Sequence, residues 1–331
     1  MTAVRVGLVG AGRIGTSHAG FLATAVHGAE LVAVADPRPG AAEVLTGQFG
    51  GRAWTDVPAM ISSDLDAIVV TASSTAHAEL VVAAAEAGKA VFCEKPMSMT
   101  LAEIGRVAAA VERAAVVAQV GFNRRFDRGF AAAHEAVISG RLGTPQLLRS
   151  VTRDPGLADP GSVPPWTIFT QTLIHDFDTV CWLADSEPVE VYASADALIA
   201  PEFKNQGLLD TAVVLITFAN GARAVAEASF SAVYGYDVRG EVFGSAGMVT
   251  VGDGARTTLQ LSDAHGRHLE TARSDVELLR DAYIGELSHF VDCVGDRVPP
   301  SPTVGDARRA LAVALACTES YQNHAPAAVQ L

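Results

Sequence analysis

The feature that most constrains this chain is a glycine triplet, Gly10-Ala11-Gly12-Arg13-Ile14-Gly15, which lies between an apolar run, Val4 to Val9, and a helix-like pattern. A side chain at Gly10 would spoil the tight turn from strand to helix, and one at Gly12 would hold a pyrophosphate away from the backbone. A side chain at Gly15 would push the helix off the strand. Because the first N–H groups of the helix point at the turn, an anion is favoured there. The spacing therefore predicts a turn that binds the diphosphate of a dinucleotide.

A second expected strand, residues 29–35, ends at Asp36. A carboxylate at this place accepts hydrogen bonds from the adenosine ribose and repels a 2′-phosphate, which favours NAD over NADP. Arg38 leaves the use of NADP open, because it could reach a phosphate or stack on adenine; alternatively it is a solvated loop residue. The residues expected at the cofactor in this part of the chain are Gly10, Gly12, Arg13, Ile14, Gly15, Asp36 and Arg38.

Strand and helix patterns alternate up to residue 121, which predicts a doubly wound parallel sheet with ligands outside the carboxyl ends of its strands. The strand at 67–72 brings Thr71, Ser73 and His77 to this edge, and we assign them to the phosphate and ribose side of the cofactor. The alternative for His77 is a capping role at the start of the next helix. The other elements expected here are helices 40–49, 57–62, 76–87 and 101–114 and strands 52–54, 90–93 and 116–121.

Glu94-Lys95-Pro96 follows the strand at 90–93 and reaches the same edge. A buried strand that ends in a charged pair and a proline indicates a functional site rather than packing alone. We expect Glu94 and Lys95 at the cofactor. The alternative for Lys95 is a local ion pair with Glu94.

The pattern changes after residue 122, so we divide the chain into a Rossmann domain, 1–122, and a second α/β domain, 123–331. Consecutive strands with short glycine turns predict a large, mostly antiparallel open sheet in the second domain. We leave open whether the C-terminal helix packs back on the first domain. The expected strands are 146–152, 189–198, 211–218, 222–230, 237–243, 247–251 and 258–261, and the expected helices are 128–139, 168–184, 283–294 and 304–322.

Composition excludes several partners. The chain has 331 residues and a net charge of −13, which argues against nucleic acid or an anionic membrane as a partner. The apolar N-terminal run is interrupted by Arg5 and passes into the glycine turn, so no signal peptide is expected. No apolar stretch reaches membrane-spanning length. The scattered cysteines predict buried thiols in a reducing cytoplasm: Cys93, Cys181, Cys293 and Cys317.

The helix expected at 168–184 carries two stripes at helical spacing. One is apolar, and the other pairs an imidazole with a carboxylate and an indole, which is typical of the wall of a cleft. The alternative is a histidine satisfied by Asp178 at an interdomain contact. The apolar stripe consists of Leu173, Ile174, Phe177, Val180, Cys181 and Ala184, and the polar one of Gln171, His175, Asp178 and Trp182.

Four segments together resemble the glucose-fructose oxidoreductase, inositol dehydrogenase and MocA family, and within it inositol 2-dehydrogenases: 10–15, 94–96, 121–126 and 172–178. The similarity runs over nearly the whole chain. The resemblance implies a Rossmann domain, a C-terminal α/β domain whose open sheet commonly supports a tetramer, and a cis peptide bond before Pro96. It also implies NAD(P)-dependent oxidation of a ring hydroxyl on a polyol or sugar.

Oxidation of a secondary alcohol needs a base for the hydroxyl proton and a cation beside the developing alkoxide. We assign His175 as the base and Lys95 as the cation. Relatives carry an aspartate four residues before the histidine, where this chain has Gln171. An amide can orient the imidazole but adds no negative charge, so we expect a lower pKa for the base than in relatives, unless Asp178 compensates.

The expected substrate contacts are Lys95, Arg125, Asp154, Gln171, His175 and Tyr236, with Tyr234 as a further candidate. The relatives' pattern has His and Asn where this chain has Thr152 and Asp154, which puts the identity of the polyol in doubt. Strand-end residues of this kind also commonly cap backbone groups. We expect no metal ion, because the histidines and carboxylates lack ligand spacing and hydride transfer needs no Lewis acid.

The leading hypothesis is a cytoplasmic, homo-oligomeric NAD-dependent dehydrogenase of a cyclic polyol, inositol first. An NADP-dependent oxidoreductase of aldoses or ketosugars is the second. The third is a nucleotide-loaded sensor without turnover, which Gln171 keeps open and the presence of Lys95 and His175 argues against.

Overall fold

The computed structural model describes residues 3–156, 159–252, 255–296 and 299–331. The chain forms two compact units. The first consists of Met1–Asn123 and Asp281–Arg308, and the second of Arg124–Arg280 and Arg309–Leu331. The first unit thus extends one residue past the boundary expected at 122 and takes in a late segment that the sequence analysis placed in the second domain.

A six-stranded parallel sheet forms the centre of the first unit, in the order β3-β2-β1-β4-β5-β6. The strand order reverses between β1 and β4, where a doubly wound sheet opens a crevice for a ligand. Every residue of β4, β5 and β6 is buried, as expected for parallel strands covered on both faces. The strands are β1 Val4–Val9, β2 Ala29–Ala35, β3 Arg52–Trp54, β4 Ala67–Val70, β5 Ala90–Glu94 and β6 Ala118–Gly121.

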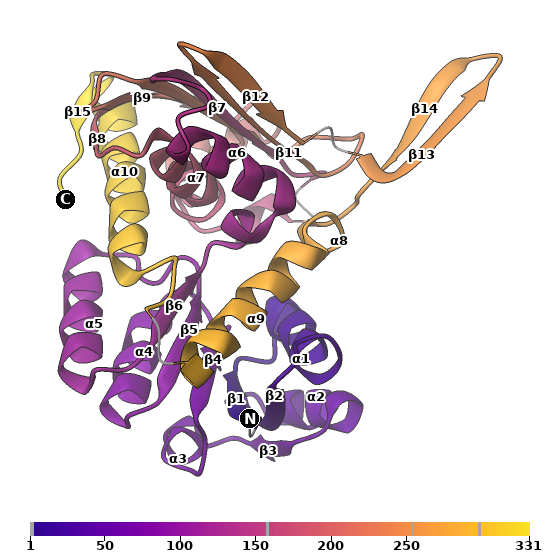
Figure 1. The fold of residues 1–331 in the computed structure, drawn as a ribbon, viewed down its shortest axis with the longest axis vertical. Helices are drawn as coiled ribbons and strands as arrows, with labels where there is room; N and C mark the ends of the chain where they lie inside the picture. The colour runs from indigo at the N-terminus through magenta and orange to yellow at the C-terminus, as the bar shows by residue number, and fades with distance from the viewer. Residues whose placement is uncertain (1–2, 157–158, 253–254, 297–298) are drawn as a thin grey trace. The chain divides into compact units, whose positions relative to one another are not determined.

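Helices cover both faces of this sheet (Figure 1). Helix α5 shows how the sequence sets their limits, because the Thr100 hydroxyl accepts the backbone N–H of Glu103 at its start and Ala115 turns left-handed at its end. Asp56 caps α3 in the same way. The helices are α1 Arg13–Thr24, α2 Ala41–Phe49, α3 Val57–Ile61, α4 His77–Glu86, α5 Leu101–Ala114 and α9 Arg280–Asp296. The predicted doubly wound α/β fold is confirmed.

The second unit holds a seven-stranded sheet in the order β12-β11-β7-β10-β9-β8-β15. All neighbours pair antiparallel except β10 and β7, so the prediction of a mostly antiparallel sheet is confirmed. Sequence analysis missed the two-residue strand β15. The strands are β7 Pro145–Arg153, β8 Pro188–Asp196, β9 Thr211–Phe218, β10 Arg223–Ser229, β11 Asp237–Gly244, β12 Gly247–Val251 and β15 Ala327–Ala328.

Helices α6, Arg128–Ile138, and α7, Ile174–Ala184, contact one face of this sheet. The helix expected at 168–184 is interrupted, because Ile168–Thr172 forms a π turn in which the Leu173 N–H donates to the Ile168 carbonyl at 2.8 Å. The chain also forms 3-10 turns and two further helices: Asn123–Phe126, Pro160–Ser162, Pro201–Gln206, α8 Asp275–Leu278 and α10 Val304–Asn323.

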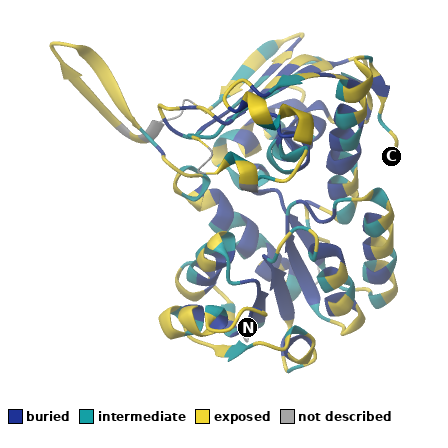
Figure 2. Cartoon of the chain, turned by 180° about the vertical axis from the view of Figure 1, so that it is seen from behind, coloured by how far each residue is buried: buried dark blue, intermediate teal, exposed yellow. Residues whose placement is uncertain are grey.

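A separate hairpin of the second unit, β13 Ala255–Asp263 and β14 Gly266–Thr271, pairs only with itself in the described sheets. Residues 259–270 are exposed throughout (Figure 2). Sequence analysis expected one strand here and missed its partner.

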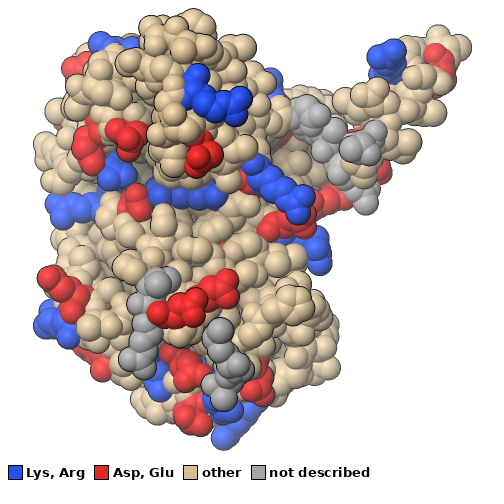
Figure 3. Space-filling model, in the orientation of Figure 1, with Lys and Arg blue, Asp and Glu red and all other residues tan. Residues whose placement is uncertain are grey.

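On the face drawn in Figure 3, acidic side chains lie among the basic ones on both units. Among the described residues, no helix has both the length and the apolar character needed to cross a bilayer.

Candidate functional site

The glycine-rich turn joins β1 to α1 as predicted. Gly10 has φ +104°, and a Cβ there would lie 2.6 Å from the Ala72 backbone nitrogen. A Cβ on Gly15 would collide with the Gly10 carbonyl oxygen, so this glycine allows the helix to approach the turn. A Cβ on Gly12 would meet nothing within 4 Å and would point into open space. The environments of Gly10 and Gly15 fit the roles assigned from the sequence, and the approach of a pyrophosphate to Gly12 stays a prediction. Arg13 is exposed and Ile14 half-buried at the start of α1.

Asp36 follows β2 and is 4% exposed. One carboxylate oxygen accepts the backbone N–H of Ala11 at 2.8 Å, which ties it to the turn. Arg38 donates from Nε and Nη2 to the two oxygens at 2.9 Å each. The hydrogen bond from Arg38 is the main cause that lowers the pKa of Asp36 to about 2, with further lowering by the Ala11 N–H. The carboxylate is therefore ionised at neutral pH.

The residues after β4 hold this edge together. The Thr71 hydroxyl donates to the Gly10 carbonyl at 2.8 Å and to the Val9 carbonyl at 3.1 Å. The buried His77 ring lies between two carbonyl oxygens, with Nδ1 2.8 Å from Pro96 O and Nε2 2.9 Å from Ala72 O. Ser73 is exposed. Thr71 and His77 thus stabilise the loops that surround the crevice, and their contact with a cofactor stays a prediction.

Glu94 and Lys95 lie at the end of β5, and the Lys95–Pro96 peptide bond is cis, as the resemblance implied. Glu94 is buried, with Oε1 2.8 Å from His18 Nε2 and Oε2 accepting the Lys95 backbone N–H at 3.1 Å. The Glu94 carboxylate therefore forms hydrogen bonds to residues of its own unit. The Lys95 side chain, in contrast, is only half-buried.

In the second unit, the expected apolar stripe, which runs from Leu173 into α7, is buried, and Gln171, His175 and Trp182 are half-buried. That they line a cleft stays a prediction. Gln171 belongs to the π turn and His175 to the first turn of α7. The hydrogen bond of the π turn spans five residues instead of four, so the positions of Gln171 and His175 around the helix axis differ from those in a continuous α-helix.

Asp178 is bound by Arg125. The guanidinium donates from Nε at 2.9 Å and from Nη2 at 2.5 Å to the two carboxylate oxygens. Arg125 also lies 5.5 Å from the centre of the Trp182 ring, and His134 stacks on the same indole at 4.1 Å. Burial, and then the charge of Arg125, lower the pKa of His134. The negative charge of Asp178 is thus largely compensated, which weakens the idea that it replaces the missing aspartate at 171.

A buried network beside His175 escaped sequence analysis. Asp176, fully buried, accepts from Arg124 Nη1 at 2.8 Å, from the Ser150 hydroxyl at 2.5 Å and from the Thr152 hydroxyl at 2.6 Å. It fixes α7 to β7. Spacing in the sequence cannot pair Asp176 with Arg124, because the two residues are far apart in the chain. The sequence also offered no feature that distinguishes the role of Arg124 from that of Arg125. Thr152 stands where the relatives' pattern has a histidine at a substrate-contact position. In this protein its hydroxyl is hydrogen-bonded within the network.

The structure places two of the predicted substrate residues near each other, because the Asp154 carboxylate lies close enough to Tyr236 to act on its phenol. Burial, followed by the negative charge of Asp154, raises the pKa of Tyr236 well above its usual range, so the phenol stays protonated. The neighbouring Tyr234 donates instead to Asp237 at 2.7 Å. Tyr234 is thus held in a separate cluster.

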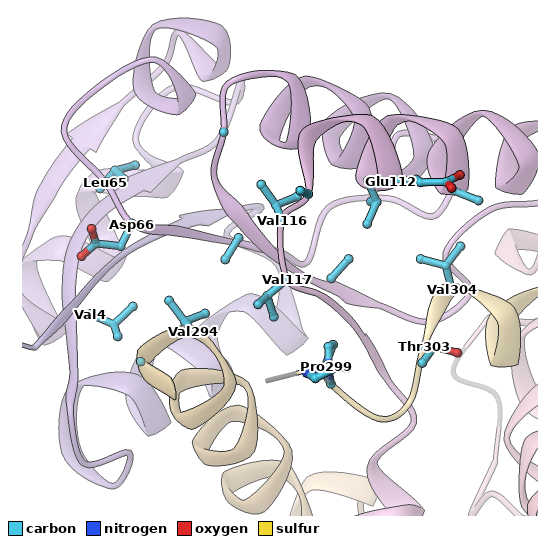
Figure 4. A pocket seen from close by; sticks show the side chains of 18 of the residues that line it. Val4, Leu65, Asp66, Glu112, Val116, Val117, Val294, Pro299, Thr303 and Val304 are labelled. Carbon is cyan, nitrogen blue, oxygen red and sulfur yellow. The ribbon is translucent and has the colours of Figure 1, made fainter. Parts of the chain in front are cut away.

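The amino ends of the first unit's strands border a groove of about 910 Å³ (Figure 4). Its labelled lining includes Val4, Asp66, Val117 and Pro299. This is the opposite edge of the sheet from Gly10, Asp36 and Glu94. In a doubly wound sheet the cofactor binds at the carboxyl edge, so this groove is not part of the candidate site.

A Rossmann sheet, a glycine turn open at Gly12 and an acidic residue after β2 define an NAD-binding oxidoreductase fold. Residues 4–122 match the oxidoreductase family with an NAD-binding Rossmann fold, and residues 130–250 match the GFO/IDH/MocA C-terminal domain. The chain belongs to the GFO/IDH/MocA family of oxidoreductases, so the resemblance seen in the sequence is confirmed.

Relatives match over almost the whole chain. Myo-inositol 2-dehydrogenase of Thermotoga maritima is 38% identical, with 96% of each chain covered. The scyllo-inositol 2-dehydrogenase (NAD(+)) of Bacillus subtilis is 34% identical over 98% of this chain and 95% of the relative. A crystal structure of scyllo-inositol dehydrogenase from Lactobacillus casei, with bound NAD(H) and scyllo-inositol, has a TM-score of 0.95 at 26% identity, covering 99% of both chains.

Proposed function

We propose that this protein oxidises a secondary ring hydroxyl of an inositol to the ketone, with NAD as the acceptor. The observation that carries the proposal is the match with inositol 2-dehydrogenases at 34% and 38% identity over nearly the full length of both chains. The Rossmann turn, the lysine after β5 and the histidine of α7 supply the residue types that this reaction needs.

The first unit fits the cofactor. The open space at Gly12 is what the approach of a pyrophosphate to the backbone requires, and α1 offers its first N–H groups there. Asp36 would bind the ribose hydroxyls. NAD, when bound, supplies the hydride acceptor.

The chain's own residues carry the proton chemistry. His175 takes the hydroxyl proton, and the Lys95 ammonium stabilises the developing negative charge on the substrate oxygen. Gln171 orients the imidazole without adding charge. Tyr236, protonated and close to Asp154, and Arg125 form the polar contacts of the ring hydroxyls.

The test is a scan of the purified protein with NAD or NADP against myo-inositol, scyllo-inositol, glucose and xylose, following the absorbance of the reduced nicotinamide. Turnover with an inositol and NAD is the expected result. His175→Ala and Lys95→Ala should each lower kcat by at least a hundredfold. The melting temperature of each variant, compared with that of the wild type, provides the control for folding.

Two other functions are distinguished by the same scan. Arg38, which now binds Asp36, carries the charge that a 2′-phosphate of NADP requires. Turnover with sugars and NADP alone would therefore support the NADP-dependent sugar oxidoreductase instead of the proposed function. Binding of NADH without any turnover would favour the sensor that Gln171 keeps open.

We further propose that the protein assembles as a homotetramer through the outer face of its seven-stranded sheet. Large apolar side chains lie on that face as cross-strand neighbours, for example Leu147 with Phe243 and Leu215 with Tyr192. Each of these four side chains is more than 40% exposed. Light scattering should give four times the monomer mass, and Leu147→Glu with Leu215→Glu should reduce it. Ala193, which lies on the buried face, makes Ala193→Ser a control that leaves the outer surface unchanged.

A further inference from the structure

Three ionisable side chains meet in the interior of the first unit: His18 from α1, Glu94 from the end of β5 and Glu286 from α9. Their exposed fractions are 0%, 6% and 0%. One donor or acceptor atom from each lies within 4.8 Å of the other two. Sequence analysis did not single out His18 or Glu286, because they are 268 residues apart and stand within helical patterns.

Glu286 differs from the other two members. His18 and Glu94 are hydrogen-bonded to each other at 2.8 Å, whereas both carboxyl oxygens of Glu286 have no hydrogen-bond partner among the described residues. The surroundings are apolar, since the His18 ring packs edge-on against Phe92 and Tyr283, each at 5.7 Å between ring centres. A second ionised carboxylate in such a place, without a partner, is strongly disfavoured.

The groups that face Glu286 define its protonation. They are His18 on α1, Glu94 at the end of β5 and Lys95, which follows this strand. Burial first, and then the negative charge of Glu94, raise the pKa of Glu286 well above its usual range, against a smaller lowering by Lys95. Geometry and charge therefore agree on a carboxyl group that keeps its proton.

Glu94 links this cluster to the strand end that carries Lys95. Its second oxygen accepts the Lys95 backbone N–H at 3.1 Å. Gly121 on the adjacent β6 lies so near that a Cβ there would be 3.2 Å from the Glu94 carboxyl carbon. The Glu94 side chain is thus confined between α1, β6 and the backbone of the residue that we assign to catalysis.

We propose that Glu286 is a positioning residue: as the neutral acid it shares its proton with the Glu94 carboxylate, so that the cluster holds one negative charge beneath Lys95 and fixes the Glu94–Lys95 strand end. One oxygen of the Glu286 carboxyl group lies within 4.8 Å of a carboxylate oxygen of Glu94. The proposal rests on the proposed function only where it assigns catalysis to Lys95, and its first test does not depend on turnover.

The first test measures unfolding by urea between pH 5 and pH 9 for the wild type and Glu286→Gln. The folded protein holds a proton that the unfolded chain releases above the ordinary carboxyl pKa of 4.5. The folding constant of the wild type should therefore fall relative to that of the variant by about tenfold per pH unit, until the pH reaches the raised pKa of Glu286 in the folded protein. Parallel curves over this range would overturn the proposal.

The second test separates positioning from general stability. Glu286→Gln can still donate to Glu94, and Glu286→Leu, of similar size, cannot. At pH 7, Glu286→Gln should keep the NADH affinity and kcat within about twofold of the wild type, and Glu286→Leu should lose about tenfold in kcat with KM little changed. Equal losses in both variants, or none in either, would contradict the proposal.

A third measurement separates a shared proton from a metal ion. If Mn²⁺ or Zn²⁺, added at one equivalent, raised the melting temperature of the wild type but not of Glu286→Gln, the cluster would be a metal site and the proposal would fail. If no polyol were turned over but unfolding showed the expected pH dependence, the proposed function would be wrong. The proposal that Glu286 is protonated would still hold.

Discussion

Arg38 occupies both oxygens of the Asp36 carboxylate, through Nε and Nη2, at 2.9 Å each. A ribose hydroxyl that binds Asp36 must displace this guanidinium, so Arg38 competes with NAD, and its charge is favourable to a 2′-phosphate. We expect Arg38→Ala to tighten NADH binding about threefold and to weaken NADPH binding by tenfold or more, measured by fluorescence titration. Arg38→Lys keeps the charge without the paired geometry and is the matched control. An unchanged ratio of the two affinities in Arg38→Ala would show that this residue does not select the cofactor.

The same pair predicts how stability depends on pH. Because the pKa of Asp36 is lowered from 3.8 to about 2, the ion pair adds stability above about pH 4, which is lost as the pH falls towards 2. The Arg38 side chain is 64% exposed, so solvent screening makes this contribution small. The difference in free energy of unfolding between wild type and Asp36→Asn should be larger at pH 6 than at pH 2.5. A difference that stays constant would argue against the ion pair.

Two glycines of the turn should respond differently to alanine. A Cβ on Gly12 meets nothing in the protein, so Gly12→Ala should keep the melting temperature and lose tenfold or more in NADH affinity. A Cβ on Gly15 collides with the Gly10 carbonyl, and Gly15→Ala should lose about 1–3 kcal/mol in free energy of unfolding. Calorimetry and NADH titration of both variants separate the two effects. If Gly12→Ala lowered the melting temperature, the added methyl group would have to meet protein atoms, and the space that we assign to the cofactor would not be open.

Gln171 should tune the base. An aspartate there adds a negative charge near His175 and favours its protonated form, so the acidic limb of the pH–rate profile should move up by about 1 pH unit in Gln171→Asp. Gln171→Asn, which is also neutral, is the control for length. If the limb stays in place in Gln171→Asp, this position does not set the pKa of the base.

Asp176 is expected to hold α7 in place without touching the substrate. Asp176→Asn leaves the buried Arg124 without its charge partner, and we expect a loss of about 3–5 kcal/mol in free energy of unfolding. The double variant Arg124→Met with Asp176→Leu should recover part of it, because the unpaired charge is gone. Urea unfolding measures all three. A single variant as stable as the wild type would rule out the structural role.

The strands and helices of residues 1–122 were predictable to within a few residues, because glycine spacing and buried strand runs are local signals, whereas the place of the late segment Asp281–Arg308 in the first unit was not. The turn at Gly10 and the acidic residue at 36 were placed correctly for the same reason. The pairings of Arg125 with Asp178 and of Asp176 with Arg124 were not predictable, since they join residues more than fifty positions apart that periodicity cannot connect. Thr71 and His77 were assigned to ligands from their place at the sheet edge. The backbone carbonyls that they contact leave no trace in the sequence.

The π turn at Ile168–Thr172 has a consequence for how this helix could have changed during evolution. Each residue of an α-helix advances about 100° around the axis, so one additional residue within a turn rotates everything on one side of it relative to the other by that amount. Deletion of a single amino acid between Ile168 and Thr172 would restore regular winding and turn the segment before Leu173 away from its present neighbours. The orientation of the Gln171 side chain relative to the imidazole of His175 therefore depends on the number of residues in the π turn as well as on the identity of residue 171.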